Sequence, residues 1–191
     1  MELFSKTRIK IGKIILSKSK KKVVRNPSFR NIREVKNIGI VWDITKTGEF
    51  VSLSRFYQKM HERKINVSMI GYYPGKYLPD QYTAVRYLTC LRDTDVNFFY
   101  IPVSSESEIF RRTDFDVLID LNFDRIFPLT YLTSLSTATL KVGLFETETS
   151  NPVFDLMIEL KKPFQVEHYL DQVIHYLEMI NSGSPTKADK L

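Results

Sequence analysis

The chain has 191 residues, of which 43% are hydrophobic and 26% charged, the composition of one ordinary globular domain with enough length for a substantial core. Its single cysteine, Cys90, excludes a disulfide within the chain, so nothing points to an oxidising compartment. No apolar run approaches the roughly 20 residues that a membrane span requires, and lysines follow the short run Ile14–Leu16 where a signal-peptide cleavage site would stand. We therefore expect a cytoplasmic protein.

Positive charge is concentrated at the N-terminus. Residues 1–36 hold 12 of the 28 Lys and Arg residues but only two acids, so this segment carries +10 while the rest of the chain carries −4. A cationic segment of this density attracts polyanions or anionic membrane surfaces. The charge is therefore evidence about partners and says nothing about the fold.

The first half of this basic arm is predicted to be an amphipathic helix. Ile9 and Leu16 interrupt its apolar stripe, and the lysines lie largely off that stripe. Such a helix could pack its apolar side on the main domain, lie on an anionic membrane, or reach along a nucleic-acid backbone. Residues 17–36 are predicted to form a basic connector that breaks at Asn26–Pro27. The stripe consists of Leu3, Phe4, Ile11, Ile14 and Ile15.

From residue 37 onward, short apolar segments alternate with helical ones. Phe115–Leu121 has the pattern of a strand buried on both faces, in which we expect Val117 and Ile119 to face one helix layer and Leu118 and Leu121 the other. The expected strands are 38–42, 65–72, 97–103, 115–121 and 140–145, with an edge strand at 154–160. The expected helices are 50–64, about 80–91, 125–135 and 166–180.

This alternation predicts an α/β protein, a three-layer sandwich with a mostly parallel sheet of five or six strands in a Rossmann-like or flavodoxin-like arrangement. The expected organisation is a basic N-terminal helix and connector at 1–36, an α/β domain at 37–181 and a disordered tail at 182–191. Oligomeric state is not predicted by any feature of the sequence.

Polar side chains follow the expected strands, at the edge where parallel sheets bind ligands. The same residue types also cap helices and form turns, and for any one of them that structural role is the favoured interpretation. A deep cleft near Asp43 and Asp120 would favour a ligand, whereas a filled edge would favour the arm as the functional element. The ligand-binding candidates are Asp43, Thr45, Lys46, Thr47, Lys76, Asp120, Asn122 and Asp124.

Two enzyme or cofactor families resemble fragments of this edge. Thr45–Glu49 resembles the phosphate loop of flavodoxins, but Glu49 and Phe50 stand where that family has Asn and Thr, and a carboxylate there repels phosphate. Asp43, followed later by Asp120 and Asp124, resembles the acidic set of haloacid-dehalogenase-type phosphohydrolases. That resemblance implies a nucleophilic Asp43, but Thr45 replaces the second Asp, which acts there as general acid.

Two further resemblances concern the fold. Residues 115–143 are similar to part of the N-terminal domain of lipopolysaccharide heptosyltransferases, whose nucleotide-sugar domain has no counterpart in this chain. Over its whole length the chain resembles an uncharacterised family of small bacterial proteins with a basic N-terminal stretch and a Rossmann-like domain. That resemblance implies a fold without an activity.

Standard cofactor and metal motifs are absent from the sequence. It has no Walker A loop and no Gly-x-Gly-x-x-Gly, and no cysteine or second ligand pair accompanies His168 and His175. We therefore expect no cofactor, no metal and no catalytic residue, and we read Cys90 as a core thiol.

The sequence thus favours a non-enzymatic, cytoplasmic binding protein that engages RNA or a ribonucleoprotein through its arm. A small-molecule or phosphate-binding protein or enzyme at the carboxyl edge of the sheet is the first alternative, and a peripheral membrane-surface protein is the second. RNA is preferred because lysines surround the helix and also cluster after it. The nucleic-acid-binding candidates are Lys18, Lys20, Lys21, Lys22, Arg25, Arg30 and Arg33.

Overall fold

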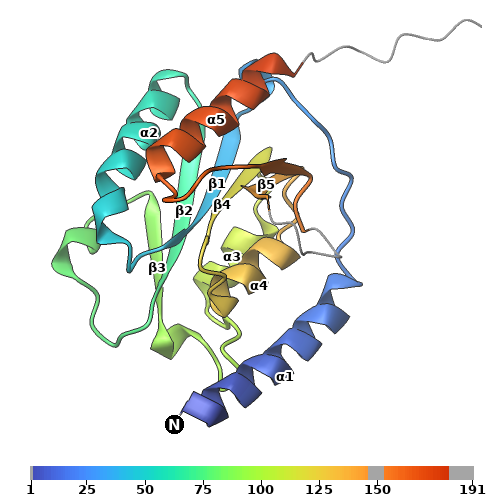
Figure 1. Cartoon of the computed structure of the whole chain (residues 1–191), viewed down its shortest axis with the longest axis vertical. Coiled ribbons are helices and arrows are strands. Elements are labelled where there is room, and N and C mark those ends of the chain that lie inside the picture. The colour runs from blue at the N-terminus through green and yellow to red at the C-terminus, as the bar shows by residue number, and fades with distance from the viewer. Residues whose placement is uncertain (1, 146–152, 181–191) are drawn as a thin grey trace, which may run out of the picture.

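The computed structural model describes residues 2–145 and 153–180, with side chains from residue 5 onward. Within these ranges, six parallel strands form one sheet in the order β3-β2-β1-β4-β5-β6, covered by helices on both faces (Figure 1). This confirms the predicted three-layer α/β sandwich. The strands are β1 Asn37–Asp43, β2 Asn66–Tyr73, β3 Leu88–Arg92, β4 Val117–Leu121, β5 Leu140–Leu144 and β6 Leu156–Ile158. The α-helices are α1 Glu2–Lys20, α2 Phe50–Glu62, α3 Ser105–Arg112, α4 Phe127–Leu135 and α5 Val166–Met179.

The strands divide their apolar side chains between two cores. Helices α2 and α5 cover the core that contains Ile119, and α3 and α4 cover the core that contains Leu118. Leu121 belongs with Val117 and Ile119 in the first core, so the prediction that it shares a layer with Leu118 is wrong. The reason is the strict period of two along a strand, which places residues 117, 119 and 121 on one face.

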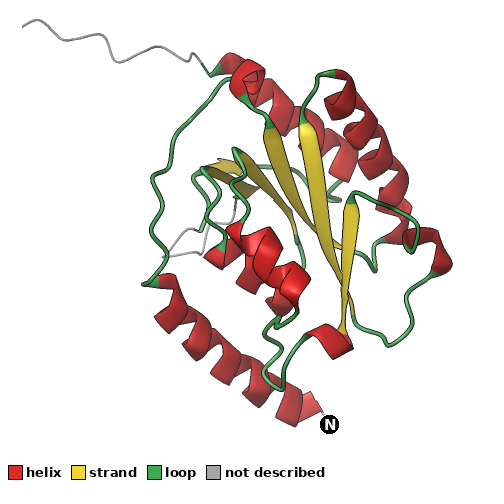
Figure 2. Cartoon of the chain, turned by 180° about the vertical axis from the view of Figure 1, so that it is seen from behind, coloured by secondary structure: helices red, strands yellow, loops and turns green. Residues whose placement is uncertain are grey.

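Helix α1 adds a further layer outside α4 (Figures 1 and 2). Leu129 and Leu132 of α4 pack toward the sheet, whereas Phe127 and Leu135 pack in a separate cluster with Leu16 of α1. A helix that is buried on both sides must be apolar all round. This accounts for the absence of any charged residue between 126 and 140.

The face that α1 turns to the domain differs from the predicted stripe. Ile9 and Leu16, which interrupt that stripe, pack on the domain, while Ile11 and Ile14 are 38% and 58% exposed. Ile15 of the stripe does pack with them. The side chains of Leu3 and Phe4, which were also expected on the stripe, lie outside the described residues.

A close approach at Gly12 explains this orientation. A methyl group at position 12 would lie 2.6 Å from the backbone oxygen of Phe99 and 2.7 Å from the Phe127 ring, so only glycine lets the helix come this near. Arg8 adds a contact on the same side, because its guanidinium stacks over the rings of Phe98 and Tyr100. The face of α1 that packs on the domain is therefore determined by the close approach at Gly12. A helical wheel of hydrophobic residues does not predict such a contact.

Two expected elements between β2 and α3 are wrong. Residues 80–91 do not form a helix, because Asp80–Tyr82 is one 3-10 turn and Leu88–Arg92 is strand β3. Leu88 and Leu91 have helical spacing, yet in the strand they enter opposite cores, an ambiguity common in short apolar runs. Residues 97–103 do not form a strand, because the Asn97 side chain accepts hydrogen bonds from the backbone N–H groups of Phe99 and Ile101 and holds a compact turn.

The remaining expected strands and helices are confirmed to within a few residues, including the short edge strand β6. No helix in the described part of the chain is long and apolar enough to cross a membrane. The expected disordered tail at 182–191 lies outside the described residues.

Truncating the central strand should test this topology. Leu118 is fully buried between the sheet and α4, so Leu118→Ala should lower the free energy of unfolding by about 2–5 kcal/mol in urea denaturation. Val51→Ala on the exposed side of α2 is the matched control, with an expected change of about 0.5 kcal/mol or less. A loss below about 1 kcal/mol for Leu118→Ala would contradict burial of the face of β4 that packs against α4.

Candidate functional site

The strand order reverses between β1 and β4, so the crevice that binds ligands in Rossmann-like sheets would open at the carboxyl ends of these two strands. Asp43 ends β1 and is only 2% exposed. Its Oδ1 accepts hydrogen bonds from the backbone N–H and the hydroxyl of Thr45, at 3.0 and 2.7 Å. These bonds hold the turn after β1, and the carboxylate faces that turn.

Side chains also connect the segments that follow β1 and β4 at this switch point. Lys46 Nζ lies 2.6 Å from Asp124 Oδ2, joining the segment after β1 to the segment after β4. The pKa of Lys46 is raised because its ammonium is hydrogen-bonded to Asp124. Ile44 is fully buried against Gly71, where a methyl group would lie 2.4 Å from its side chain. These contacts tie the two segments together at the centre of the edge, where the Lys46 and Asp124 side chains are themselves 47% and 58% exposed.

The turn that resembles a flavodoxin phosphate loop contains Glu49, whose half-buried carboxylate is hydrogen-bonded within the protein. Glu49 accepts a hydrogen bond of 2.9 Å from the indole N–H of Trp42, and burial raises its pKa. Thr47 is exposed at the start of the short turn before α2. A negatively charged, half-buried side chain at this position disfavours a phosphate group in the loop.

Asp120 and Asn122 shape the end of β4 and the start of α4. Asp120, 4% exposed, accepts hydrogen bonds from the Asn122 N–H at 2.7 Å and from the Thr133 hydroxyl at 2.6 Å. Asn122 accepts from the Ile126 N–H at 2.7 Å, and its amide donates to the Ile126 carbonyl and to the Thr130 hydroxyl. Their polar groups are thus used to position α4.

Lys76 lies apart from the other carboxyl-edge candidates. It is exposed in the loop after β2, with its ammonium 5.5 Å from the centre of the Tyr77 ring. Of the eight ligand-binding candidates, the structure therefore brings together Asp43 with Thr45, Lys46 with Asp124, and Asp120 with Asn122. Each of these contacts is internal to the protein.

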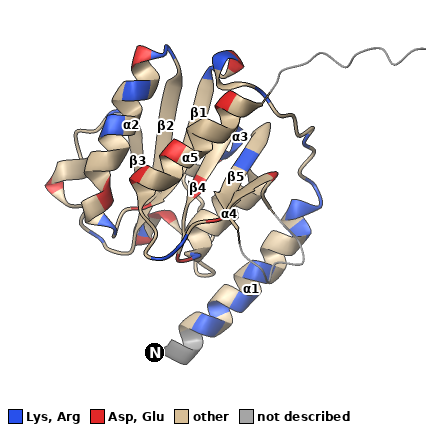
Figure 3. Cartoon of the chain, turned by 45° about the horizontal axis from the view of Figure 1, so that its top comes forward, with Lys and Arg blue, Asp and Glu red and all other residues tan. Residues whose placement is uncertain are grey.

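The arm presents a row of uncompensated positive charge. Lys and Arg positions recur along α1 from residue 6 onward and continue into the connector (Figure 3). Among the described residues, none of these lysines forms an ion pair with a carboxylate. By contrast, Arg55, Lys59 and Arg63 of the α2 side are paired with acids of α5. We call the exposed set the basic ridge: Lys6, Lys10, Lys13, Lys18, Lys21 and Lys22.

Lys20, another nucleic-acid-binding candidate, is only partly exposed at the end of α1 and is left out of the ridge. Arg25 and Arg30 hold the connector onto the domain. Arg25 is largely buried, lies 2.5 Å from the Asp155 carboxylate and donates a hydrogen bond of 2.9 Å to the backbone oxygen of Ala138. Arg30 lies 2.8 Å from Asp116. These two guanidiniums have internal partners, which the charge of the segment alone does not reveal.

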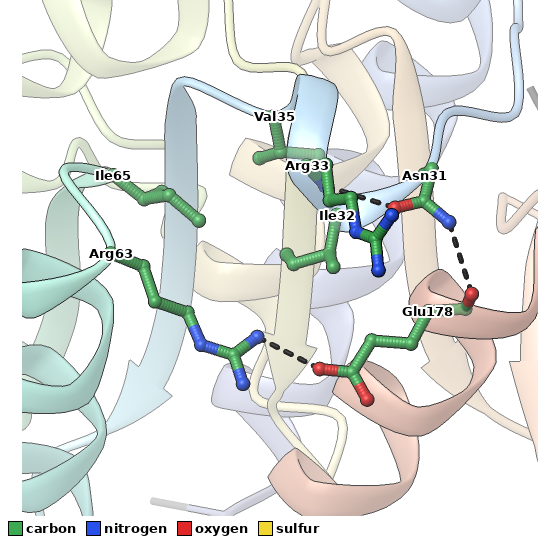
Figure 4. Close-up of a pocket in the computed structure, with 7 residues that line it drawn as sticks. All are labelled: Asn31, Ile32, Arg33, Val35, Arg63, Ile65 and Glu178. Carbon is green, nitrogen blue, oxygen red and sulfur yellow. Dashed lines mark hydrogen bonds and ion pairs between the residues drawn. The ribbon is translucent and has the colours of Figure 1, made fainter.

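Arg33 lies away from the ridge, at the amino end of the sheet, where it lines a pocket of about 650 Å³ (Figure 4). The pocket has an apolar floor that includes Ile32 and Ile65. Arg63 at its rim is neutralised by Glu178 at 2.9 Å, and Asn31 is bonded to the end of α5. Arg33 thus faces a different surface from the lysines of the arm.

A buried lysine lies beneath the anchor point of the connector. Lys141 on β5 is 1% exposed and donates a hydrogen bond of 3.2 Å to the Ser134 carbonyl. Burial, reinforced by the positive charge of Arg25, lowers the pKa of its ammonium to about 7. Sequence analysis missed it because a single lysine in an apolar strand segment gives no sign that its side chain points inward.

Sequence analysis also missed a second basic group beside the arm. Arg111 and Arg112 end α3, and both contact Glu108. The signals for this helix were present: Ser104 caps its first turn, acids follow in that turn, and two arginines close it.

These features define a Rossmann-like α/β domain with a docked basic helix. The chain belongs to a family of unknown function (DUF6913), whose family model matches residues 8–180. The match includes most of α1, so the arm and the sheet are covered by one family model. No curated protein matches the chain.

The buried lysine gives a prediction about pH. In the unfolded chain Lys141 has its ordinary pKa near 10.4, so between about pH 7 and 10 the unfolded state holds more protons than the folded state. Stability should therefore rise with pH across this window, by up to about 1.4 kcal/mol per pH unit from this group. Lys141→Met should be more stable than the parent at pH 7, and this advantage should shrink toward pH 10.

Urea denaturation at several pH values between 7 and 10 measures this difference. Lys36→Met, an exposed lysine at the start of β1, serves as the control and should leave the pH dependence of the parent unchanged. A stability difference between Lys141→Met and the parent that stays constant across the window would contradict a depressed pKa.

Proposed function

We propose that the protein binds RNA, free or within a ribonucleoprotein particle, through the basic ridge. The observation that carries this proposal is that the docked arm exposes six lysines, four on α1 and two directly after it, and that none of them has a carboxylate partner among the described residues. A helix of 19 residues is about 28 Å long, so the ridge forms an extended track that suits a phosphate backbone. The proposed role is binding without catalysis, in the cytoplasm.

The carboxyl edge supports the first alternative less well. Asp43, Asp120 and Asn122 are buried and already hydrogen-bonded, and Lys46 is paired with Asp124 across the switch point. A ligand there would have to displace these contacts. A small-molecule or phosphate-ligand function therefore has weaker support than the arm.

An anionic membrane surface is the second candidate, favoured by the exposure of Ile11 and Ile14 between the lysines. Two isoleucines offer little apolar area for insertion, because amphipathic membrane helices bury a broad apolar face that here is turned toward α4. RNA is preferred because cations outnumber exposed apolar side chains on the outward side of α1.

The proposal predicts binding that depends steeply on salt. Five contacts with single-stranded RNA give a slope of log affinity against log salt of about −3.5. A variant with five ridge lysines changed to Gln should flatten this slope and weaken binding at low salt in fluorescence anisotropy with a labelled oligouridylate. Arg25 is left intact because it anchors the connector. The five lysines are Lys10, Lys13, Lys18, Lys21 and Lys22.

A charge-matched control makes the result specific. Five exposed lysines away from the ridge, also changed to Gln, should leave the slope unchanged although the net charge falls equally. Equal binding by the ridge variant and the parent, or flotation of the parent with phosphatidylserine vesicles without RNA binding, would contradict the proposal. The control set is Lys36, Lys64, Lys76, Lys161 and Lys162.

A further inference from the structure

A second pocket opens where the basic ridge ends. It has a volume of about 310 Å³ and lies between the end of α1 with the following connector, the end of α3, and α4. Lys22, Arg111 and Arg112 contribute three cations to its lining. This volume is at the lower end of the range for ligand pockets, which suits a group the size of one nucleotide.

The positive charge at this pocket exceeds the negative charge that surrounds it within the protein. Helices α1, α3 and α4 all end near the pocket, and their carbonyl ends together carry roughly one and a half negative charges. Glu108 adds one more through its contacts with Arg111 and Arg112. The cations gathered at this point outnumber these negative charges about two to one, because three further lysines precede the pocket: Lys18, Lys20 and Lys21.

The pocket also has an apolar side. Val24 is 90% exposed at its rim, and Val23 and the partly exposed Tyr131 line it as well. Arg112 is 76% exposed, so its guanidinium can reach a ligand despite its contact with Glu108. Cations beside an exposed aromatic and aliphatic wall match the two halves of a nucleotide, its phosphate and its base.

We propose that this pocket receives one unpaired nucleotide, with its phosphate on Lys22 and Arg112 and its base against Tyr131 and Val24. The inference rests on the proposed function for the source of the nucleotide, an RNA strand that lies along the basic ridge. It adds that the strand is single, because a base within a duplex cannot leave its stack to enter a pocket without a cost.

A neutral substitution that fills the pocket tests the inference. Thr137 is exposed and lines the pocket, so Thr137→Trp should occupy the space without changing the charge. With a labelled ten-nucleotide oligouridylate, affinity should fall about tenfold, the size expected for the loss of one stacked base. Affinity for a ten-base-pair RNA duplex and the salt dependence should stay unchanged. Ala84→Trp, on the exposed surface before β3, is the matched control and should bind both RNAs as the parent does.

Thermal melting checks that Thr137→Trp is folded. If it is not, Val24→Ser replaces it, since a residue this exposed contributes little to stability, and severalfold weaker binding of the single strand alone is expected. The inference is overturned if a folded pocket variant binds the single strand as tightly as the parent. It is equally overturned if single strand and duplex lose the same affinity, because the variant then only obstructs the ridge.

Uridine monophosphate separates this inference from the proposed function. A parent that binds no RNA but binds the mononucleotide, and loses it in Thr137→Trp, would refute the RNA function and leave the pocket as a site for free nucleotides. A parent that binds RNA through the ridge, with no effect of Thr137→Trp, would refute the pocket alone. Binding of neither RNA nor mononucleotide refutes both.

Discussion

The close approach of α1 to the domain at Gly12 is the constraint on which the proposed RNA-binding surface depends. Without a side chain at this position the helix lies against the backbone of Phe99 and the ring of Phe127. Leu16 then enters the cluster beside α4, and the lysines are turned outward. The same contact covers the outer side of α4, whose apolar residues would otherwise face water.

The docked arm separates cations that look equivalent in the sequence. Arg25 and Arg30 pair with Asp155 and Asp116 and hold the connector, and Arg33 faces the opposite end of the domain. The ridge lysines keep their charge uncompensated among the described residues. The exposed positive charge therefore lies on α1 and the first connector residues, next to the arginines that end α3. The structure thus joins two basic segments that are about 90 residues apart in the chain.

Much of the fold could be predicted from the sequence, because apolar runs such as Val117–Leu121 and helical periodicity such as that of Val166–Met179 are visible in the local sequence. The errors fall where a specific contact decides the conformation. The Asn97 side chain accepts a hydrogen bond from the nearby backbone and holds a turn, and the close approach at Gly12 determines which face of α1 packs on the domain. The positions of Asp43 and Asp120 at strand ends were predictable, but their hydrogen bonds were not. The pocket beside Arg112 depends on three helices meeting, which no local pattern encodes.

Photo-crosslinking tests most directly whether the ridge and its adjoining surface are the site of RNA contact. An oligouridylate containing 4-thiouridine, irradiated with the protein and mapped by mass spectrometry, should attach to peptides from residues 10–24 and to the peptide that contains Tyr131. Excess unlabelled RNA should remove these crosslinks, since they come from one saturable surface. Crosslinks confined to the carboxyl edge near Asp43 and Asp120, or spread without preference over the chain, would contradict the account.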